Sequence, residues 1–377
     1  MRTKRAFVIM ARIIISIITV SIYTSCNDGS KKQRPQDPST PYGYHTEDVT
    51  FRNDQANITL AGTLTLPSKD GIYPAVVLIS GSGPQNRNSE FAGHRPFLVL
   101  ADYLTKNGIA VLRYDDRGFG QSTGNFGAGT SMDFSYDVES AVKYLKARKE
   151  IEKDKIGLIG HSDGAMIAPM VAARSSDVSF IVLLAGPGLP GAKVLLERQE
   201  LLERKMGFSD VQIEKSRRHA EQMIQIVASS NDAELTRTEL INFSKNNYDD
   251  IPEYAIPPGM SKDQFISKHI EMLSSPWFKF FLTYDPTTTL QKVKCPVLAL
   301  NGDKDVQVPS ESNLEGIKHA LVVGGNQDVT VEKIPGLNHA FQECVTGMPD
   351  EYGKIEQTFA PVALTKISDW IQQQTAD

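Results

Sequence analysis

Two hydrophobic patterns alternate along much of the chain. Short runs bounded by turn residues are typical of strands, and apolar residues spaced three to four positions apart indicate amphipathic helices. Continuous apolar runs in particular favour buried parallel strands, and their alternation with helices predicts a parallel sheet covered on both faces. The expected strands lie at residues 48–52, 58–66, 75–79, 109–114, 155–160, 180–184, 296–300 and 329–334. The expected helices around this sheet lie at residues 97–107, 133–148, 165–174, 310–319 and 360–373.

The alternation stops between residues 187 and 290. This block is rich in charge and helical in period, with helices expected at 195–205, 210–228 and near 262–274. Because the sheet pattern resumes directly afterwards, we interpret the block as a helical cap inserted into a core made of residues 45–186 and 291–377. A separate accessory domain is the alternative. The aromatic cluster at residues 277–281 is expected either to wall a substrate pocket or to form the core of the cap.

The first 26 residues have the pattern of an export signal. Met1–Arg5 is basic, and the apolar stretch Ile13–Tyr23 is too short to span a bilayer. The sequence Tyr23-Thr-Ser-Cys26 resembles the end of a bacterial lipoprotein signal, which implies that Cys26 is lipidated and that the chain is anchored in the cell envelope, on its periplasmic or surface face. A plain secretory signal and an uncleaved anchor are the alternatives. Residues 27–44 are polar and are predicted to form a flexible tether.

Composition and charge narrow the range of functions. The 377 residues are 40% hydrophobic and 23% charged, which is ordinary for a globular protein. The net charge is −5 although the first 25 residues are basic, so an acidic body without a basic run argues against a nucleic-acid partner. Three cysteines do not form a disulfide framework. No C-x-x-C or H-E-x-x-H pattern is present, so the sequence predicts no metal site.

One short motif predicts a nucleophile. Gly160-His-Ser-Asp-Gly164 matches G-x-S-x-G, the sharp strand-to-helix turn that exposes a serine hydroxyl above a sheet. A second match surrounds Ser122, but it lies between loop segments rather than between a strand and a helix. We therefore predict Ser162 as the nucleophile and Ser122 as a loop residue. His161 adjoins the nucleophile and is expected to point elsewhere.

A serine needs a base, and the base needs an orienting acid. Where a serine sits on this kind of turn, the chain order is serine, acid, histidine. Asp305 follows the expected strand 296–300 and is our preferred acid, while Asp303 is interpreted as a turn residue that remains the alternative. His339 follows the last expected strand in a loop that contains glycine, and we predict it as the base.

Two backbone N–H groups are expected to form an oxyanion hole. One belongs to Asp163, the residue after the nucleophile, whose side chain is expected to face solvent or to pair with a cation. The other is assigned to Ser82, with Gly83 as the alternative, in the loop after strand 75–79. A further interpretation is that these glycines only make a tight turn.

The combined motifs resemble a known family. The segments Ser80–Arg87, His94–Phe97, Arg113–Ser122 and Gly160–Gly164 are similar to those of bacterial secreted esterases in the α/β-hydrolase superfamily. The resemblance covers roughly residues 49–186 and 293–373, and it covers the cap only in position. It implies an α/β-hydrolase fold with a mostly parallel eight-stranded sheet, hydrolysis of a small carboxylic ester and no cofactor.

Together these features predict an envelope-anchored esterase that forms an acyl-enzyme. Residues 115–117 are expected to brace the loop beside the site. Glu90, His94 and Arg95 are expected either to line or gate the pocket or to pair with each other or with the cap. A serine peptidase or aminoacyl hydrolase of the prolyl-oligopeptidase type is one alternative, because such enzymes share the triad. A non-catalytic binding lipoprotein on a hydrolase fold is the other, since a fold alone does not establish catalysis.

Overall fold

The computed structural model describes residues 33–248, 251, 256–257 and 259–376. Within these residues the chain forms two compact units, a helical unit at Pro190–Tyr284 and a larger unit made of the described residues before and after it. The helical unit falls inside the block 187–290 that the sequence pattern sets apart. Cys26 and the rest of the expected export signal lie outside the described residues.

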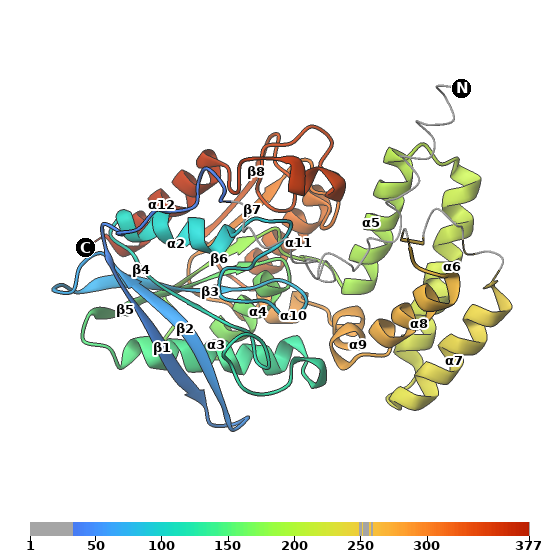
Figure 1. Cartoon of the computed structure of the whole chain (residues 1–377), viewed down its shortest axis with the longest axis horizontal. Coiled ribbons are helices and arrows are strands. Elements are labelled where there is room, and N and C mark those ends of the chain that lie inside the picture. Colours follow the sequence, from blue (N-terminus) through green and yellow to red (C-terminus); the bar gives the residue numbers. More distant parts are fainter. Residues whose placement is uncertain (1–32, 249–250, 252–255, 258, 377) are drawn as a thin grey trace. The chain divides into compact units, whose positions relative to one another are not determined.

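The larger unit is built on one eight-stranded sheet (Figure 1). Its strands follow the order β1-β2-β4-β3-β5-β6-β7-β8. β2 is antiparallel to β1 and to β4, and every other neighbouring pair is parallel. The mostly parallel eight-stranded sheet is thus confirmed. The strands are β1 (His45–Asn53), β2 (Ile58–Leu66), β3 (Tyr73–Ile79), β4 (Ala110–Tyr114), β5 (Ile151–His161), β6 (Phe180–Leu184), β7 (Val297–Gly302) and β8 (Val329–Ile334).

Burial along the strands follows their place in the sheet. Every residue of β4, β6 and β7 is buried, as expected for central strands covered on both faces. At the two edges the pattern changes. β1 alternates between exposed and buried positions over much of its length, and β8 is buried only at Ile334. The apolar runs in the sequence therefore mark the centre of the sheet.

Helices cover both faces of this sheet. α2 and α12 lie on one face and α3 and α4 on the other (Figure 1). No helix among the described residues is both long and apolar enough to cross a membrane. The helices of the larger unit are α2 (Pro96–Lys106), α3 (Ser131–Lys146), α4 (Asp163–Ala172), α10 (Thr287–Leu290), α11 (Ser310–Val323) and α12 (Pro361–Thr375), with short 3₁₀ turns η2 (Phe126–Ala128) and η5 (Pro349–Lys354).

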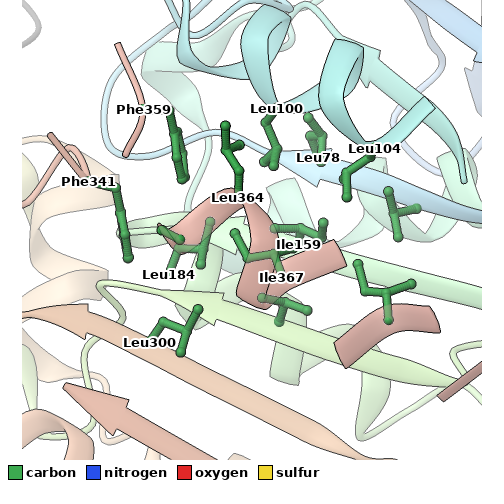
Figure 2. Packing of buried hydrophobic residues seen from close by; sticks show 14 of the residues in the cluster. Leu78, Leu100, Leu104, Ile159, Leu184, Leu300, Phe341, Phe359, Leu364 and Ile367 are labelled. Atoms are coloured by element: carbon green, nitrogen blue, oxygen red, sulfur yellow. The ribbon is translucent and has the colours of Figure 1, made fainter. Parts of the chain in front are cut away.

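The main apolar core lies between the sheet and the pair α2 and α12 (Figure 2). Leu100 and Leu104 of α2 and Ile367 of α12 are fully buried in it. Burying one such side chain stabilises a fold by roughly 1.5–3 kcal/mol. Phe341 and Phe359 stack at 5.5 Å between ring centroids, so this core extends to the loop that carries His339.

The helical unit has an apolar cluster of its own. Its helices are α5 (Gly191–Lys205), α6 (Asp210–Ser229), α7 (Ala233–Asn246), α8 (Lys262–Leu273) and α9 (Pro276–Thr283). α7 and α9 are not in the sequence prediction. Phe278 is buried in the cluster with Trp277 and Phe281 packed against it, as expected for the core of a cap, whereas Phe280 stacks on Tyr284 at 5.0 Å.

Within the segment 27–44 that is predicted to be a tether, residues 34–37 make close contacts with the larger unit. Arg34 is 4% exposed, and its guanidinium donates to four backbone carbonyl oxygens, those of residues 92, 93, 353 and 355. Asp37 is buried and accepts a hydrogen bond from Arg95 at 2.6 Å. Gln36 bonds to the backbone of Thr358 and Phe359. Residues 34–37 are therefore polar because their side chains bond to backbone groups and to Arg95 of the larger unit.

We expect Arg34→Ala to lower the free energy of unfolding by about 2–4 kcal/mol, because it removes a buried charge together with the hydrogen bonds it donates. Urea denaturation of the chain from residue 27 onward measures the change. Arg52→Ala is the control, since Arg52 is exposed and pairs with the exposed Asp54. Equal stability of the two variants would contradict a structural role for the segment.

Candidate active site

Ser162 lies at the turn between β5 and α4. Its backbone has φ +56° and ψ −116°, a conformation that L-residues other than glycine rarely adopt. Such strain costs about 1–3 kcal/mol and persists only where the surroundings enforce it. The Ser162 amide donates to Leu184 O at 2.8 Å, which fixes the turn against β6. The predicted nucleophile therefore sits on a strained strand-to-helix turn.

The two glycines of the motif permit a very close approach of backbone segments. A Cβ on Gly160 would lie 2.0 Å from Gly164 O. A Cβ on Gly164 would lie 2.2 Å from Ile79 O and 2.6 Å from Ser80 O. All three distances are well inside van der Waals contact. The motif needs glycine here because α4 starts directly against the ends of β3 and β5.

His339 and Asp305 are in direct contact. Asp305 Oδ2 accepts a hydrogen bond from His339 Nδ1 at 2.8 Å, and both residues are buried. The other oxygen, Oδ1, accepts from the amides of Gln307 at 2.7 Å and Val308 at 3.0 Å. With its proton on Nδ1, the ring presents a basic Nε2. The structure thus brings together the predicted acid and base.

Asp303 and Ser122 are the residues that the sequence offers beside Asp305 and Ser162, and both make other contacts. Asp303 is exposed, and its Oδ1 accepts from the Gly336 amide at 2.7 Å, so it is a turn residue. Ser122 is buried, donates to Asp115 O at 2.6 Å and accepts from the Ala61 amide at 2.9 Å. Neither side chain bonds to His339 in the described hydrogen bonds.

His161 does not point away from the site as the sequence analysis expected. Its ring lies 4.9 Å from the ring of His339 between centroids, and its Nε2 donates to His339 O at 2.9 Å. Burial, together with the nearby His339, lowers the pKa of His161 to about 4. His161 is therefore neutral at ordinary pH. It supports the loop of His339 through its hydrogen bond to the His339 carbonyl oxygen. It also links Ser162, its neighbour in sequence, to that loop.

A buried polar network holds the other side of the His339 loop. His94 is fully buried, with Nδ1 2.9 Å from Thr358 Oγ1 and Nε2 2.9 Å from Tyr352 O. Gln342, three residues after His339, lies 3.1 Å from His94 Nε2 through its side-chain amide. Burial lowers the pKa of His94. His94 thus pairs with neighbouring groups, and sequence spacing gives no signal for this because its partners lie about 250 residues away.

The loop after β3 runs alongside the nucleophile. A Cβ built on Gly81 would lie 3.3 Å from Ser162 Cβ and 3.4 Å from His161 O. Ser82, the predicted oxyanion donor, is the next residue of this loop. Its assignment as a donor, like that of the Asp163 amide, stays a prediction.

The side chain of Asp163 does not face solvent. It is 3% exposed rather than solvent-facing, and Ser131 Oγ donates to it at 2.9 and 3.2 Å from its two oxygens. The side chain points into the layer between α4 and α3 because Ser131 opens α3 there. Among the described residues, no cluster of three or more His, Cys, Asp or Glu side chains is placed to hold a metal ion.

The sheet order, the flanking helices and the serine turn define an α/β-hydrolase fold. Solved structures with this architecture are similar over most of the chain. The α/β hydrolase GrgF from Penicillium sp. sh18 aligns with TM-score 0.56 and 17% identity over 88% of this chain and all of its own. The Pyrococcus furiosus esterase Pf2001 aligns with TM-score 0.53 and 16% identity over 89% of this chain and 92% of its own.

Sequence comparison gives a relative of the same kind. Esterase EstD of Thermotoga maritima is 27% identical over 301 residues, which are 79% of this chain. The match spans 60% of the length of EstD. A model of the family described as serine aminopeptidase, S33, matches residues 95–237. The chain is therefore similar to hydrolases, and to esterases of this superfamily in particular.

We expect Gly164→Ala to destabilise the core by about 3 kcal/mol or more, because the added Cβ meets backbone atoms that have no free space to move. Thermal unfolding followed by circular dichroism measures the loss. Gly127→Ala is the matched control, since its Cβ would meet only a side-chain oxygen at 3.5 Å. A Gly164→Ala variant as stable as the control would refute the packing argument.

Proposed function

We propose that the chain is a serine hydrolase of carboxylic esters and that Ser162, His339 and Asp305 form its catalytic triad. One arrangement carries this proposal. The strained Ser162 turn lies next to His161, whose ring contacts His339, and His339 is held by Asp305 at 2.8 Å. The similarity to EstD and to the Pf2001 esterase supports an ester as the substrate.

In this mechanism Ser162 Oγ attacks the acyl carbon while His339 Nε2 takes its proton. Asp305 keeps the other imidazole proton on Nδ1 and stabilises the imidazolium that forms. The amides of Ser82 and Asp163 donate to the oxyanion. The C–O bond to the alcohol then breaks, and His339 returns the proton to the leaving alcohol. Water repeats the sequence on the acyl-enzyme and releases the acid, so no cofactor is needed.

We expect Ser162→Ala to lower kcat for p-nitrophenyl esters by about 10⁴- to 10⁶-fold, because the nucleophile is lost. The assay uses acetate through octanoate esters and the chain from residue 27 onward. Ser122→Ala is the matched control from the second G-x-S-x-G motif, and it should retain turnover. Near-wild-type activity in Ser162→Ala would refute the assignment of the nucleophile. A wild type that neither turns over esters nor reacts with a fluorophosphonate would favour a binding protein.

A peptide or aminoacyl substrate is the second candidate. The family model that matches residues 95–237 is described as a serine aminopeptidase, and the same triad cleaves amides. Parallel assays with aminoacyl p-nitroanilides and short p-nitrophenyl esters separate the two. A kcat/KM that is higher for the anilide would favour the peptidase.

We also propose that the protein is held in the bacterial cell envelope by a lipid on Cys26. The basic start, the apolar stretch and the Tyr23-Thr-Ser-Cys26 sequence support this.

We expect Cys26→Ala to abolish incorporation of labelled palmitate and to release the protein from the membrane fraction. Cys295→Ala is the control and should leave both unchanged. Palmitate labelling that persists in Cys26→Ala would refute the anchor.

A further inference from the structure

Asp116 ties together the two ends of the loop after β3. Its Oδ1 accepts a hydrogen bond from Ser80 Oγ at 2.7 Å, and its Oδ2 accepts from the Gln85 amide at 2.8 Å. The Asp116 amide in turn donates to Gln85 O at 3.1 Å. One side chain at the end of β4 therefore closes the segment 80–85 into a small ring.

The side chain of Gln85 links this arrangement to Ser82, in the middle of the loop. Its side-chain Nε2 donates to Ser82 O at 3.3 Å, and Ser89 Oγ donates to its Oε1. The position of Ser82 thus depends on Gln85, and the position of Gln85 depends on Asp116. The opposite side of the loop meets the nucleophile, since a Cβ on Gly81 would lie 3.3 Å from Ser162 Cβ.

The site of Asp116 is unusual for a structural carboxylate. No basic side chain bonds to it in the described hydrogen bonds, whereas its neighbour Asp115 accepts from Arg87 at 2.8 Å. Burial, with a smaller contribution from the charges of Asp137 and Asp163, raises the pKa of Asp116 to about 7 against the opposing effect of the hydrogen bonds from Ser80 and Gln85. A carboxylate kept here without a bonded cation indicates that the two hydrogen bonds are its role.

We propose that Asp116 is a positioning residue for the oxyanion hole: it fixes loop 80–85 so that an amide of this loop faces the developing charge beside Ser162. The inference rests on the proposed ester hydrolysis. It assigns Asp116 no contact with substrate. Preorganised donors act only on the transition state, so their displacement lowers kcat and leaves KM nearly unchanged.

Three variants test the proposal. Asp116→Ala removes both acceptors and should lower kcat by about 10- to 100-fold with KM within about twofold, because an oxyanion donor contributes on the order of 10²–10³ in rate. Asp116→Asn should restore kcat to within about threefold of wild type, since its amide oxygen accepts from the Gln85 amide and its NH₂ group donates to Ser80 Oγ. Ser80→Ala removes only one of the two hydrogen bonds, and its kcat should lie between those of Asp116→Ala and Asp116→Asn.

A control separates positioning from stability. Asp37→Asn also weakens a buried carboxylate site, since Asp37 pairs with Arg95 at 2.6 Å, but Asp37 makes no hydrogen bond to loop 80–85 among the described hydrogen bonds. Each rate is normalised to the fraction of protein that a fluorophosphonate labels at completion. Asp37→Asn is expected to lower the melting temperature and leave the normalised kcat unchanged.

A transition-state analogue gives a second readout. Ser162 Oγ adds to the carbonyl carbon of an aryl trifluoromethyl ketone, the π pair moves to the oxygen, and His339 keeps the serine proton. The resulting oxyanion needs the same donors as the reaction. We expect the affinity for this ketone to fall in Asp116→Ala by the same factor as kcat/KM.

The outcomes are distinct. An active wild type with an unchanged normalised kcat in Asp116→Ala overturns this inference alone. A loss of kcat that Asp37→Asn shows to the same extent, or one that Asp116→Asn fails to restore, overturns it as well. A wild type that turns over no ester overturns the proposed function and this inference with it. A selective loss of kcat in Asp116→Ala, together with the parallel loss of ketone affinity and the rescue by asparagine, supports it.

Discussion

The close packing of α4 against the ends of β3 and β5 is the constraint on which the candidate site depends. Gly160 and Gly164 allow backbone atoms to meet at distances that exclude any side chain. This packing forces Ser162 into its positive-φ conformation and so holds its hydroxyl at the carboxyl edge of the sheet. The strain at one residue is offset by the burial of the whole first part of α4.

The remaining candidate residues reach the same edge from separate strands. The loop of Ser82 follows β3, Asp116 follows β4, Asp305 follows β7 and His339 follows β8. In a largely parallel sheet these ends converge, and this is where α/β proteins bind their ligands. Hydrogen bonds hold the polar groups of these loops, and Leu337 and Phe341 also anchor the His339 loop in the apolar core. The apolar core thus fixes the carboxyl edge of the sheet, and polar contacts fix the positions of the candidate residues at that edge.

The sequence predicts the strands of the sheet better than the helices of the inserted helical unit. The predicted bounds of β2, β6 and β8 coincide with those observed, since short runs between turn residues mark strands clearly. α7 escapes prediction because only Thr236 and Leu240 of its residues are buried, which leaves a weak apolar stripe. The contacts of His161 and His94 depend on groups brought together by folding, and no local pattern records them.

If Cys26 carries the proposed lipid, the docking of Arg34 would limit how far the larger unit can move from it. Under the proposed modification of Cys26, eight residue steps join the lipid to the docked side chain. A fully extended chain of that length reaches at most about 28 Å. A polar spacer running to Tyr44 would have allowed more than twice that reach. The larger unit would then stay close to the membrane, and esters at or near the bilayer surface would be the substrates that it encounters most often.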